Sequence, residues 1–421
     1  MKTFSDKWGI ASKVELVSFE RGVFSSTARY RVKFTAPATE GKPAEERDVL
    51  FVEQLSHGPL PLSNLKTGAF MPAMVASDFA LEETPAVKEW FAAAKGVTPL
   101  TGHYSVSYAK NITGKFNLAP VEVAKGDTNL SFSGMTGNVE YATGTKHGVV
   151  DLKTDKLVMS GQSENSDIVS MALQGITLES DMTPASNDMY VGTQKLTFKD
   201  WTITSKEKPP VQFKDTTIAA DVKEANSLLG AKMALDFGMI NVQGKDMAGM
   251  KLAIDVQKLD SKAFKALNDV YEAASRRMMQ SKGEEQTPQF TPEEQQILKT
   301  NVELLLAGNP TLAVSPLEVR TANGTSTFNL NLDLAKPASM DGEFADTLTQ
   351  AVRKLDAKVV LSKGNLTDLM AIEPQMRGVP AEQAAQTAKG QAEMVGTMAA
   401  AMGMAKVCLL YTSPSPRDLS T

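Results

Sequence analysis

The chain is poor in the residues from which chemical sites are built. Its 421 residues include one cysteine and three histidines. A single cysteine excludes an intramolecular disulfide, and His103 and His147 have no cysteine, histidine or carboxylate neighbours at the spacing of metal ligands. No Gly-x-Gly-x-x-Gly follows a strand pattern and opens a helix, and no serine has the context of a nucleophile elbow. We therefore expect no metal, no cofactor and no enzymatic activity.

Basic stripes and long apolar runs are also missing. The 44 Lys and Arg residues are outnumbered by 49 Asp and Glu, for a net charge of −5, which argues against nucleic acid as a partner. The start of the chain has no apolar run of about 20 residues and no signal-peptide core. The segment Met394–Tyr411 is about long enough to cross a bilayer, but Gly396, Gly403 and Lys406 argue against a span.

Strand patterns dominate what is present. From Val14 to Leu361, short segments alternate apolar and polar residues, as strands do when one face is dry and the other wet. Because parallel strands covered on both faces read as continuous apolar runs, this alternation favours antiparallel pairing. The clearest segments are Arg29–Phe34, Tyr104–Tyr108, Asn129–Ser133, Thr197–Ile203 and Thr327–Leu334. The sequence predicts an α+β fold, mostly antiparallel β, in which a long curved meander sheet carries a few covering helices.

Turn residues separate the predicted strands. They occur at Lys125–Asp127, Ala142–Gly144, Lys153–Lys156, Lys206–Pro210 and Ala322–Gly324. Asn323-Gly324 is the strongest hairpin signal among them, because both residues accept the left-handed backbone that a tight hairpin turn requires.

Five helices are predicted. Thr84 is expected to cap a short helix over residues 85–94 that begins at Pro85 and is closed by Gly96. Apolar spacing predicts a helix over 261–280, and the capping-box pattern Thr291–Glu294 opens another that runs to Leu306. Two more, at 343–353 and 380–402, flank a strand at 356–362.

The domain organisation follows from the same patterns. We expect residues 1–405 to form a single elongated β-rich domain, with candidate subdomain boundaries near Pro209 and in the polar loop around residue 285. Residues 406–421 break sharply in composition, and Cys408–Asp418 resembles the conceptual translation of a sequencing adapter; a natural disordered tail is the alternative. In either case we expect this tail to make no core contact.

Two motifs near the N-terminus carry a family resemblance. Phe19–Ser26 reads Phe-Glu-Arg-Gly-Val-Phe-Ser-Ser and leads into a strand, and His57–Leu62 reads His-Gly-Pro-Leu-Pro-Leu and leads out of one. Together they resemble the paired signatures of the YdgA-like family, a bacterial family of unknown function. Ser315–Leu317, Asn323-Gly324 and Lys354–Lys358 also lie where that family has similar segments. The resemblance covers roughly residues 14–400.

The resemblance implies a location but no activity. It points to a Gram-negative envelope protein that is anchored in the inner membrane by an N-terminal helix and has its bulk in the periplasm. This chain lacks the apolar span at its start and runs into the atypical tail after the Ala/Met-rich helix, so we expect a gene fragment whose anchor is missing.

The two motifs also supply the candidate site residues. An exposed Arg21 on a tight turn would suit an anionic headgroup, whereas the structural interpretation places Gly22 at a turn or bulge, with Phe24 buried beside Ser25. His57, followed by Gly58 and Pro59, is either a titratable group in a cleft or a turn residue bonded to local backbone. We expect adjacent strands to bring the two motifs close together.

Two function hypotheses remain. A third hypothesis, a hydrolase, has no support from the residue inventory. The preferred one is a non-enzymatic envelope protein whose sheet offers an apolar groove to a lipid or an envelope-protein partner, walled by the helices between Phe264 and Leu306 and by Met394–Met404. The alternative is a structural or assembly factor that acts through homo-oligomerisation or exposed sheet edges.

Overall fold

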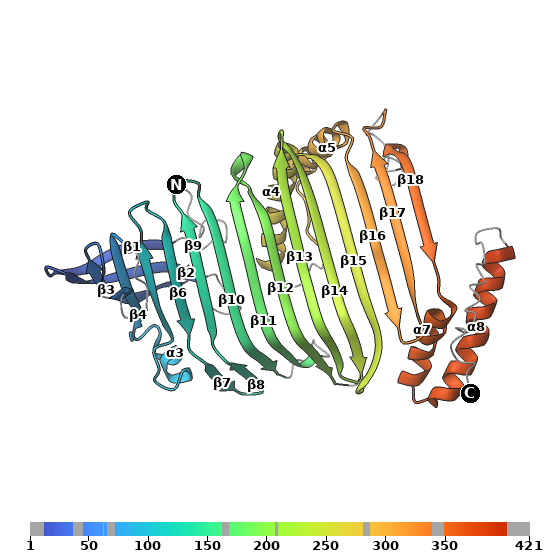
Figure 1. Cartoon of the computed structure of the whole chain (residues 1–421), viewed down its shortest axis with the longest axis horizontal. Coiled ribbons are helices and arrows are strands. Elements are labelled where there is room, and N and C mark those ends of the chain that lie inside the picture. The colour runs from blue at the N-terminus through green and yellow to red at the C-terminus, as the bar shows by residue number, and fades with distance from the viewer. Residues whose placement is uncertain are drawn as a thin grey trace, which may run out of the picture.

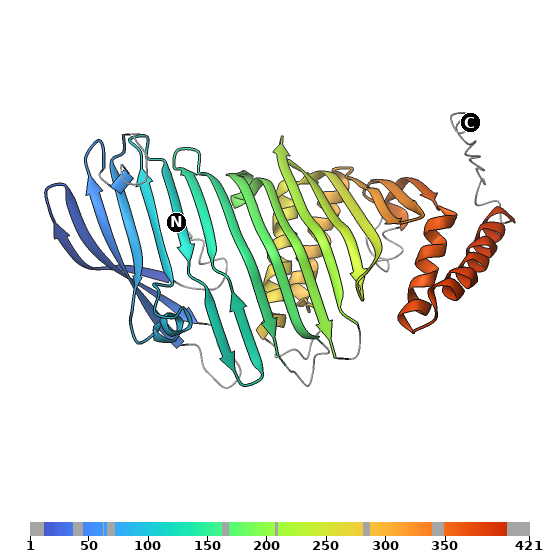
Figure 2. The same ribbon diagram turned by 60° about the horizontal axis from the view of Figure 1, so that its bottom comes forward.

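The protein is built on a single antiparallel sheet. The computed structural model describes residues 12–36, 45–61, 63–64, 72–161, 168–206, 209–280, 287–338 and 349–401. Within them, 18 strands form one open, curved sheet, with helices lying against it and beyond its last strand (Figures 1 and 2). The predicted fold class is confirmed.

Most strands pair with their neighbours in sequence. The strands are β1 Ser12–Arg21, β2 Ser25–Ala36, β3 Glu45–His57, β4 Val75–Glu82, β5 Leu100–Val106, β6 Ile112–Leu118, β7 Val121–Lys125, β8 Thr128–Phe132, β9 Met135–Ala142, β10 His147–Ser160, β11 Ile168–Pro184, β12 Tyr190–Ser205, β13 Val211–Ala225, β14 Leu228–Val242, β15 Lys245–Asp260, β16 Thr311–Thr321, β17 Gly324–Leu334 and β18 Val352–Val360. The hairpin β7–β8 is the exception to the meander, since β6 pairs with β9 and β8 pairs with the second half of β10. Among the described strands, β1 and β18 each have a neighbour on one side only.

Three of the five predicted turns are confirmed and one is wrong, while residues 207 and 208 of the turn predicted at Lys206–Pro210 lie outside the described residues. Lys153–Lys156 lies inside β10, where that strand changes its partner from β9 to β8. Thr154 is buried there, and its hydroxyl donates a hydrogen bond to the carbonyl of Gly134 in the β8–β9 link. These polar residues therefore bond to a neighbouring connection in mid-strand instead of turning the chain.

The central strands are longer than the predicted segments because the alternation of side chains between the two faces changes phase partway along each strand. In β12 the rings of Phe198 and Trp201 lie 6.3 Å apart, although side chains three residues apart on a regular strand point to opposite faces. Left-handed backbone occurs close by in the neighbouring strands, at Gly175 (φ 59°) and Asp215 (φ 51°). Phe213 continues the stack, with its ring 5.0 Å from that of Trp201. These changes of phase keep aromatic side chains on one face along strands such as the 16-residue β12.

The helices are α3 Lys88–Ala93, the 3-10 helix η1 Ser186–Asp188, α4 Ser261–Gln280, α5 Pro292–Ala307, α7 Lys363–Met376 and α8 Ala381–Ala401. The predictions for α4, α5 and α8 are confirmed to within a residue or so. For α3 the predicted start is wrong: Val87 is the N-cap, and Thr84 accepts the Val87 N–H through its carbonyl in a preceding turn.

Two further helix predictions need correction. The helix α7 was not predicted; Ser362 caps it by accepting the N–H of Asn365, whose fully buried side chain bonds to Thr321 and Gly324. Of the helix predicted at 343–353, residues 343–348 lie outside the described residues and 349–351 are helical, but the predicted end is wrong because β18 begins at Val352.

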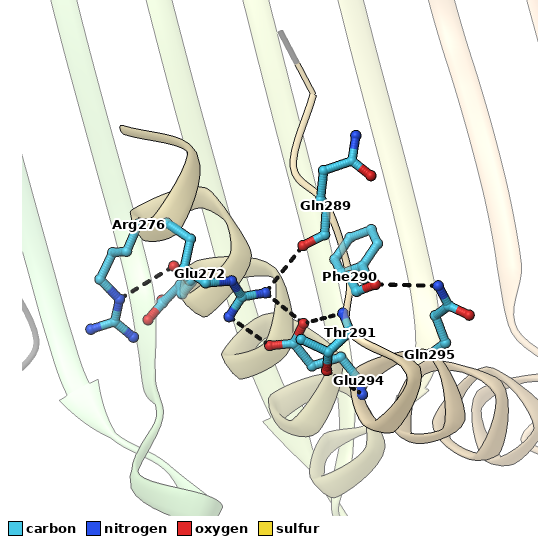
Figure 3. A network of polar contacts seen from close by, with 8 residues as sticks. Glu272, Arg276, Gln289, Phe290, Thr291, Glu294 and Gln295 are labelled. Carbon is cyan, nitrogen blue, oxygen red and sulfur yellow. Dashed lines mark hydrogen bonds and ion pairs between the residues drawn. The ribbon is translucent and has the colours of Figure 1, made fainter. Parts of the chain in front are cut away.

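Helices α4 and α5 form a braced pair (Figure 3). Thr291 and Glu294 make the predicted capping box, and the Arg277 guanidinium of α4 donates to both carboxylate oxygens of Glu294 at 2.8 and 2.5 Å. Arg277 also donates to the carbonyl of Gln289, which precedes α5. The pair lies against the sheet behind β12–β15 in both ribbon views (Figures 1 and 2).

The core is divided into small clusters. One packs Leu81, Val87 and Phe91 under α3, and another joins α7 to α8 through Ala371, Ala384 and Ala388. Most of the fully buried apolar residues among those described are alanines, whereas most of the large apolar side chains of the sheet, with exceptions such as Leu229 and Val242, are half-buried or exposed. These side chains stay accessible because, within the described ranges, no second sheet packs on the single layer.

Candidate functional site

The structure brings the two N-terminal motifs together. Gly22 lies in the β1–β2 turn, where its N–H donates to the Ser25 carbonyl at 2.8 Å. The N–H of His57 donates to the carbonyl of Phe24 at 2.8 Å, and its Nε2 lies 2.8 Å from the Ser26 hydroxyl. Their predicted proximity and the turn at Gly22 are therefore confirmed.

Phe24, however, is not buried. Its side chain is 73% exposed and that of the preceding Val23 is 85% exposed, so the predicted burial of Phe24 is wrong. The ring has no opposing layer to enter, because the turn projects past the end of the sheet. Arg21 and Ser25 are likewise exposed.

The second motif forms hydrogen bonds that hold the chain beside the β1–β2 turn. Gly58 has the left-handed φ of 103°, and the carbonyl of Pro59 accepts the N–H of Ala73 across the β3–β4 loop. His57 thus lies at a turn, as one interpretation had it, but its partners are the backbone of Phe24 and the hydroxyl of Ser26 in the neighbouring β1–β2 hairpin rather than local backbone. Ser26 is only 3% exposed, so the Ser26–His57 contact does not present a serine to a substrate.

The other histidines lie in hydrogen-bonded pairs. Both ring nitrogens of His103 are engaged, Nδ1 with Asp78 at 2.7 Å and Nε2 with Asn64 at 3.0 Å. His147 contacts Asp181 at 2.7 Å. Among the described residues, no group of three or more His, Cys, Asp or Glu side chains is placed to hold a metal ion.

The most extensive feature is a row of side chains that crosses the sheet, here called the cross-sheet row. Directly paired residues place one member on every strand except β7 and β8. From β1 to β18 they are Phe19, Ala28, Glu53, Phe79, Gly102, Phe116, Gly137, Leu152, Leu178, Leu196, Ile218, Leu235, Leu252, Leu317, Phe328 and Val359. Apart from Glu53, every member is apolar or glycine. The row thus forms an apolar band that is interrupted at Glu53 and is unbroken from Phe79 to Val359.

Much of this band is accessible. Ile218 is 42% exposed and Val359 is 58% exposed, while the leucines from Leu152 to Leu317 are half-buried. In a monomeric soluble protein, a contiguous apolar surface of this kind marks a place of interaction.

Glycine and phenylalanine alternate where the row crosses β4 to β9. A Cβ on Gly102 would lie 2.4 Å from Cζ of Phe79, and a Cβ on Gly137 would lie 2.3 Å from the ring of Phe116. Each ring therefore covers the glycine of the next strand, an arrangement that shields a strand glycine from water and fixes the register.

Glu53 is the one ionisable group in the row. Burial raises the pKa of its carboxyl above the ordinary value of 4.5, although the Tyr104 hydroxyl, which donates to it at 3.2 Å, opposes the rise. Burial, together with the nearby Glu53 charge, raises the pKa of Tyr104 to about 12. The ring of Phe79 lies 6.4 Å from that of Tyr104, so the carboxyl sits in aromatic surroundings.

A groove of about 740 Å³ runs across β10–β16 on the opposite face. It is lined by Ala219 and Ala234, which are sequence neighbours of Ile218 and Leu235 and so point away from the cross-sheet row. Carboxylates surround these alanines, among them Asp151, Glu179 and Asp221.

This corrects the predicted walls of the apolar groove. The hollow lies on the face opposite the cross-sheet row, and its lining comes from strands alone rather than from the α4–α5 pair. Helix α8, which carries Met394, packs on α7 beyond β18 and far from that pair in both views (Figures 1 and 2). Residues 402–404 of the predicted Met-rich wall lie outside the described residues.

Sequence reasoning found the strands of the row but not the row itself. The alternation identifies which face of each strand is apolar, whereas the register between strands fixes which residues stand side by side. Spacing within β6 and β9 gave no sign that Phe116 would cover Gly137.

Fold and surface together define a class: a single-layer antiparallel β-sheet protein with an accessible apolar band. The chain belongs to the family described as bacterial protein of unknown function (DUF945), whose model matches residues 4–408.

Two relatives from Escherichia coli (strain K12) are similar to the chain. Protein YdgA is 25% identical over 406 residues, which cover 92% of this chain and 78% of YdgA. The uncharacterized protein YihF is 20% identical over 384 residues, covering 89% of this chain and 77% of YihF. No solved structure matches the chain. None of the helices in the described part has the length and apolarity needed to cross a membrane.

Proposed function

We propose that this protein is a non-enzymatic protein of the Gram-negative cell envelope that binds lipid, or a lipid-bearing envelope protein, on the apolar band of its curved sheet. The observation that carries the proposal is the cross-sheet row, in which apolar side chains stand side by side across the sheet and remain accessible at Ile218 and Val359. Acyl chains recognise such a surface through burial of apolar area, at about 25 cal/mol per Å².

The location in this proposal, on the periplasmic side of the inner membrane, rests on the family resemblance of the two N-terminal motifs. The absence of a catalytic role rests on the residue inventory and on the engagement of the three histidines with partners in strands and turns. The binding experiment depends neither on the location of the protein nor on the absence of catalysis.

Uptake of a hydrophobic fluorescent probe, with native mass spectrometry for co-purified phospholipid, tests the proposal. Ile218→Lys places a charge in the row at an exposed position and should abolish probe uptake. Thr217→Lys is the matched control, because it adds the same charge one residue earlier on the same strand but on the other face. Equal uptake by the two variants and the wild type would refute the proposal.

A second candidate function is an assembly factor that acts through sheet edges. Its motivation is that β18 is paired on one side only among the described strands and carries the exposed residues Leu355 and Val359. Native mass spectrometry separates the two: bound lipid favours the first function, and a defined homo-oligomer without lipid favours the second.

A further inference from the structure

A surface at one end of the strands is not explained by the apolar band. Strand pairing places the β1–β2 turn, the β3–β4 loop, the β5–β6 turn and the β9–β10 turn at this end, and the β11–β12 and β13–β14 connections follow further along the sheet. We call the part of this end that the first four connections form the turn rim. Its described residues differ from those of an ordinary polar turn region.

The tip of the β1–β2 turn is apolar and fully presented to solvent. Val23 is 85% exposed and Phe24 is 73% exposed. Beside them, Leu60 of the β3–β4 loop is 51% exposed and Tyr108 of the β5–β6 turn is 60% exposed. Loops normally place small polar residues at such positions.

The tip is also held in place. A Cβ on Gly22 would lie 2.4 Å from the Ser25 carbonyl oxygen, so the turn requires glycine at this position. His57 fixes the other side through its N–H bond to Phe24 and its contact with the buried Ser26. Val23 and Phe24 are thus held outside the sheet rather than left free to fold back onto it.

Basic side chains outnumber acidic ones at the rim. Arg21 at the end of β1, Lys110 in the β5–β6 turn and Lys146 in the β9–β10 turn are exposed, and the described turn segments 22–24, 58–61, 107–111 and 143–146 contain no carboxylate. Glu20, which precedes Arg21 in β1, is exposed as well and is the carboxylate nearest in sequence to these turns. Apolar and aromatic tips combined with basic flanks fit an anionic bilayer surface, where rings enter the interface and cations meet the headgroups.

We infer that the turn rim docks onto an anionic lipid bilayer, with Val23 and Phe24 entering the interface and Arg21, Lys110 and Lys146 contacting headgroups. The rim is separate from the cross-sheet row, so the inference stands apart from the proposed function. The inference assigns one role to both N-terminal motifs, because the hydrogen bonds of His57 hold the β1–β2 turn that carries Val23 and Phe24.

Co-sedimentation with vesicles of phosphatidylglycerol and phosphatidylcholine tests the inference. Phe24→Ser should lower partitioning by about ten-fold or more, because the buried area of one aromatic side chain is lost. Arg21→Gln should lower it by about five-fold on these vesicles and leave binding to pure phosphatidylcholine unchanged. Val97→Ser is the matched control, since Val97 is 58% exposed but lies at the other end of β5.

The outcomes are distinct from those for the apolar band. Wild-type protein that takes up the probe but does not sediment with vesicles would overturn the rim inference and leave the proposed function standing. Equal losses in Phe24→Ser and Val97→Ser would also overturn it, because the contact would then be unspecific. A Phe24→Ser variant that loses vesicle binding, keeps probe uptake and melts like the wild type supports it.

Discussion

Replacing Gly137 by alanine should loosen the sheet between β6 and β9, contrary to what strand propensity alone suggests. A glycine inside a strand costs about 0.5–1 kcal/mol relative to alanine, so propensity predicts a gain. The new methyl would, however, lie 2.3 Å from two atoms of the Phe116 ring, and overpacking of this kind costs about 1–3 kcal/mol. The ring must move off the row, and we expect a net loss of about 1–2 kcal/mol.

Hydrogen exchange is the suitable assay. In a single-layer sheet each strand contacts mainly its neighbours, so opening is local rather than global. A loss of about 1–2 kcal/mol should speed amide exchange in peptides from β6 and β9 by about 5- to 30-fold, with little change in β13–β15.

Two further variants make this prediction specific. Phe116→Leu removes the ring, so adding Gly137→Ala to it should cost far less than Gly137→Ala alone; the difference measures their coupling. Gly144→Ala is the control, because a methyl at that turn position meets nothing within 4 Å. Unchanged or slower exchange in Gly137→Ala would refute the close contact between the ring and the glycine.

Three other outcomes are expected. Glu53→Gln should stabilise the protein at pH 7, because burial disfavours the charged form of Glu53 and so raises the pKa of its carboxyl. The gain in stability should shrink as the pH falls towards 4.5, which urea titrations at pH 7 and 4.5 would measure. Glu294→Gln should have the opposite profile, because Arg277 lowers the pKa of Glu294. The variant should be less stable than the wild type above pH 4.5, and the two should converge in stability as the pH falls below the lowered pKa. A stability difference that does not depend on pH would contradict the ion pair. Phe24→Ala should change stability by less than about 0.5 kcal/mol, and a loss of 3 kcal/mol or more in thermal melts would show that its ring is buried after all.

The sequence by itself determined the fold class, most hairpin turns and the α4–α5 pair, because these depend on local rules. Alternation over two residues defines a half-buried strand, Asn323-Gly324 suits a tight turn, and a capping box needs only Thr291 and Glu294 three residues apart. The proximity of the two N-terminal motifs also followed from sequence, since both stand at the ends of consecutive strands.

Only the tertiary structure decided what the surfaces are. Burial of Phe24 was the reasonable expectation for a phenylalanine beside a strand, yet no second layer reaches the turn that carries it. Lys153–Lys156 reads as a turn but is held straight by the β8–β9 link, and the hollow of the sheet lies on the face of Ala219 rather than that of Ile218. The cross-sheet row depends on register, the joint result of all strand pairings, and a shift of one residue in any pairing would break it.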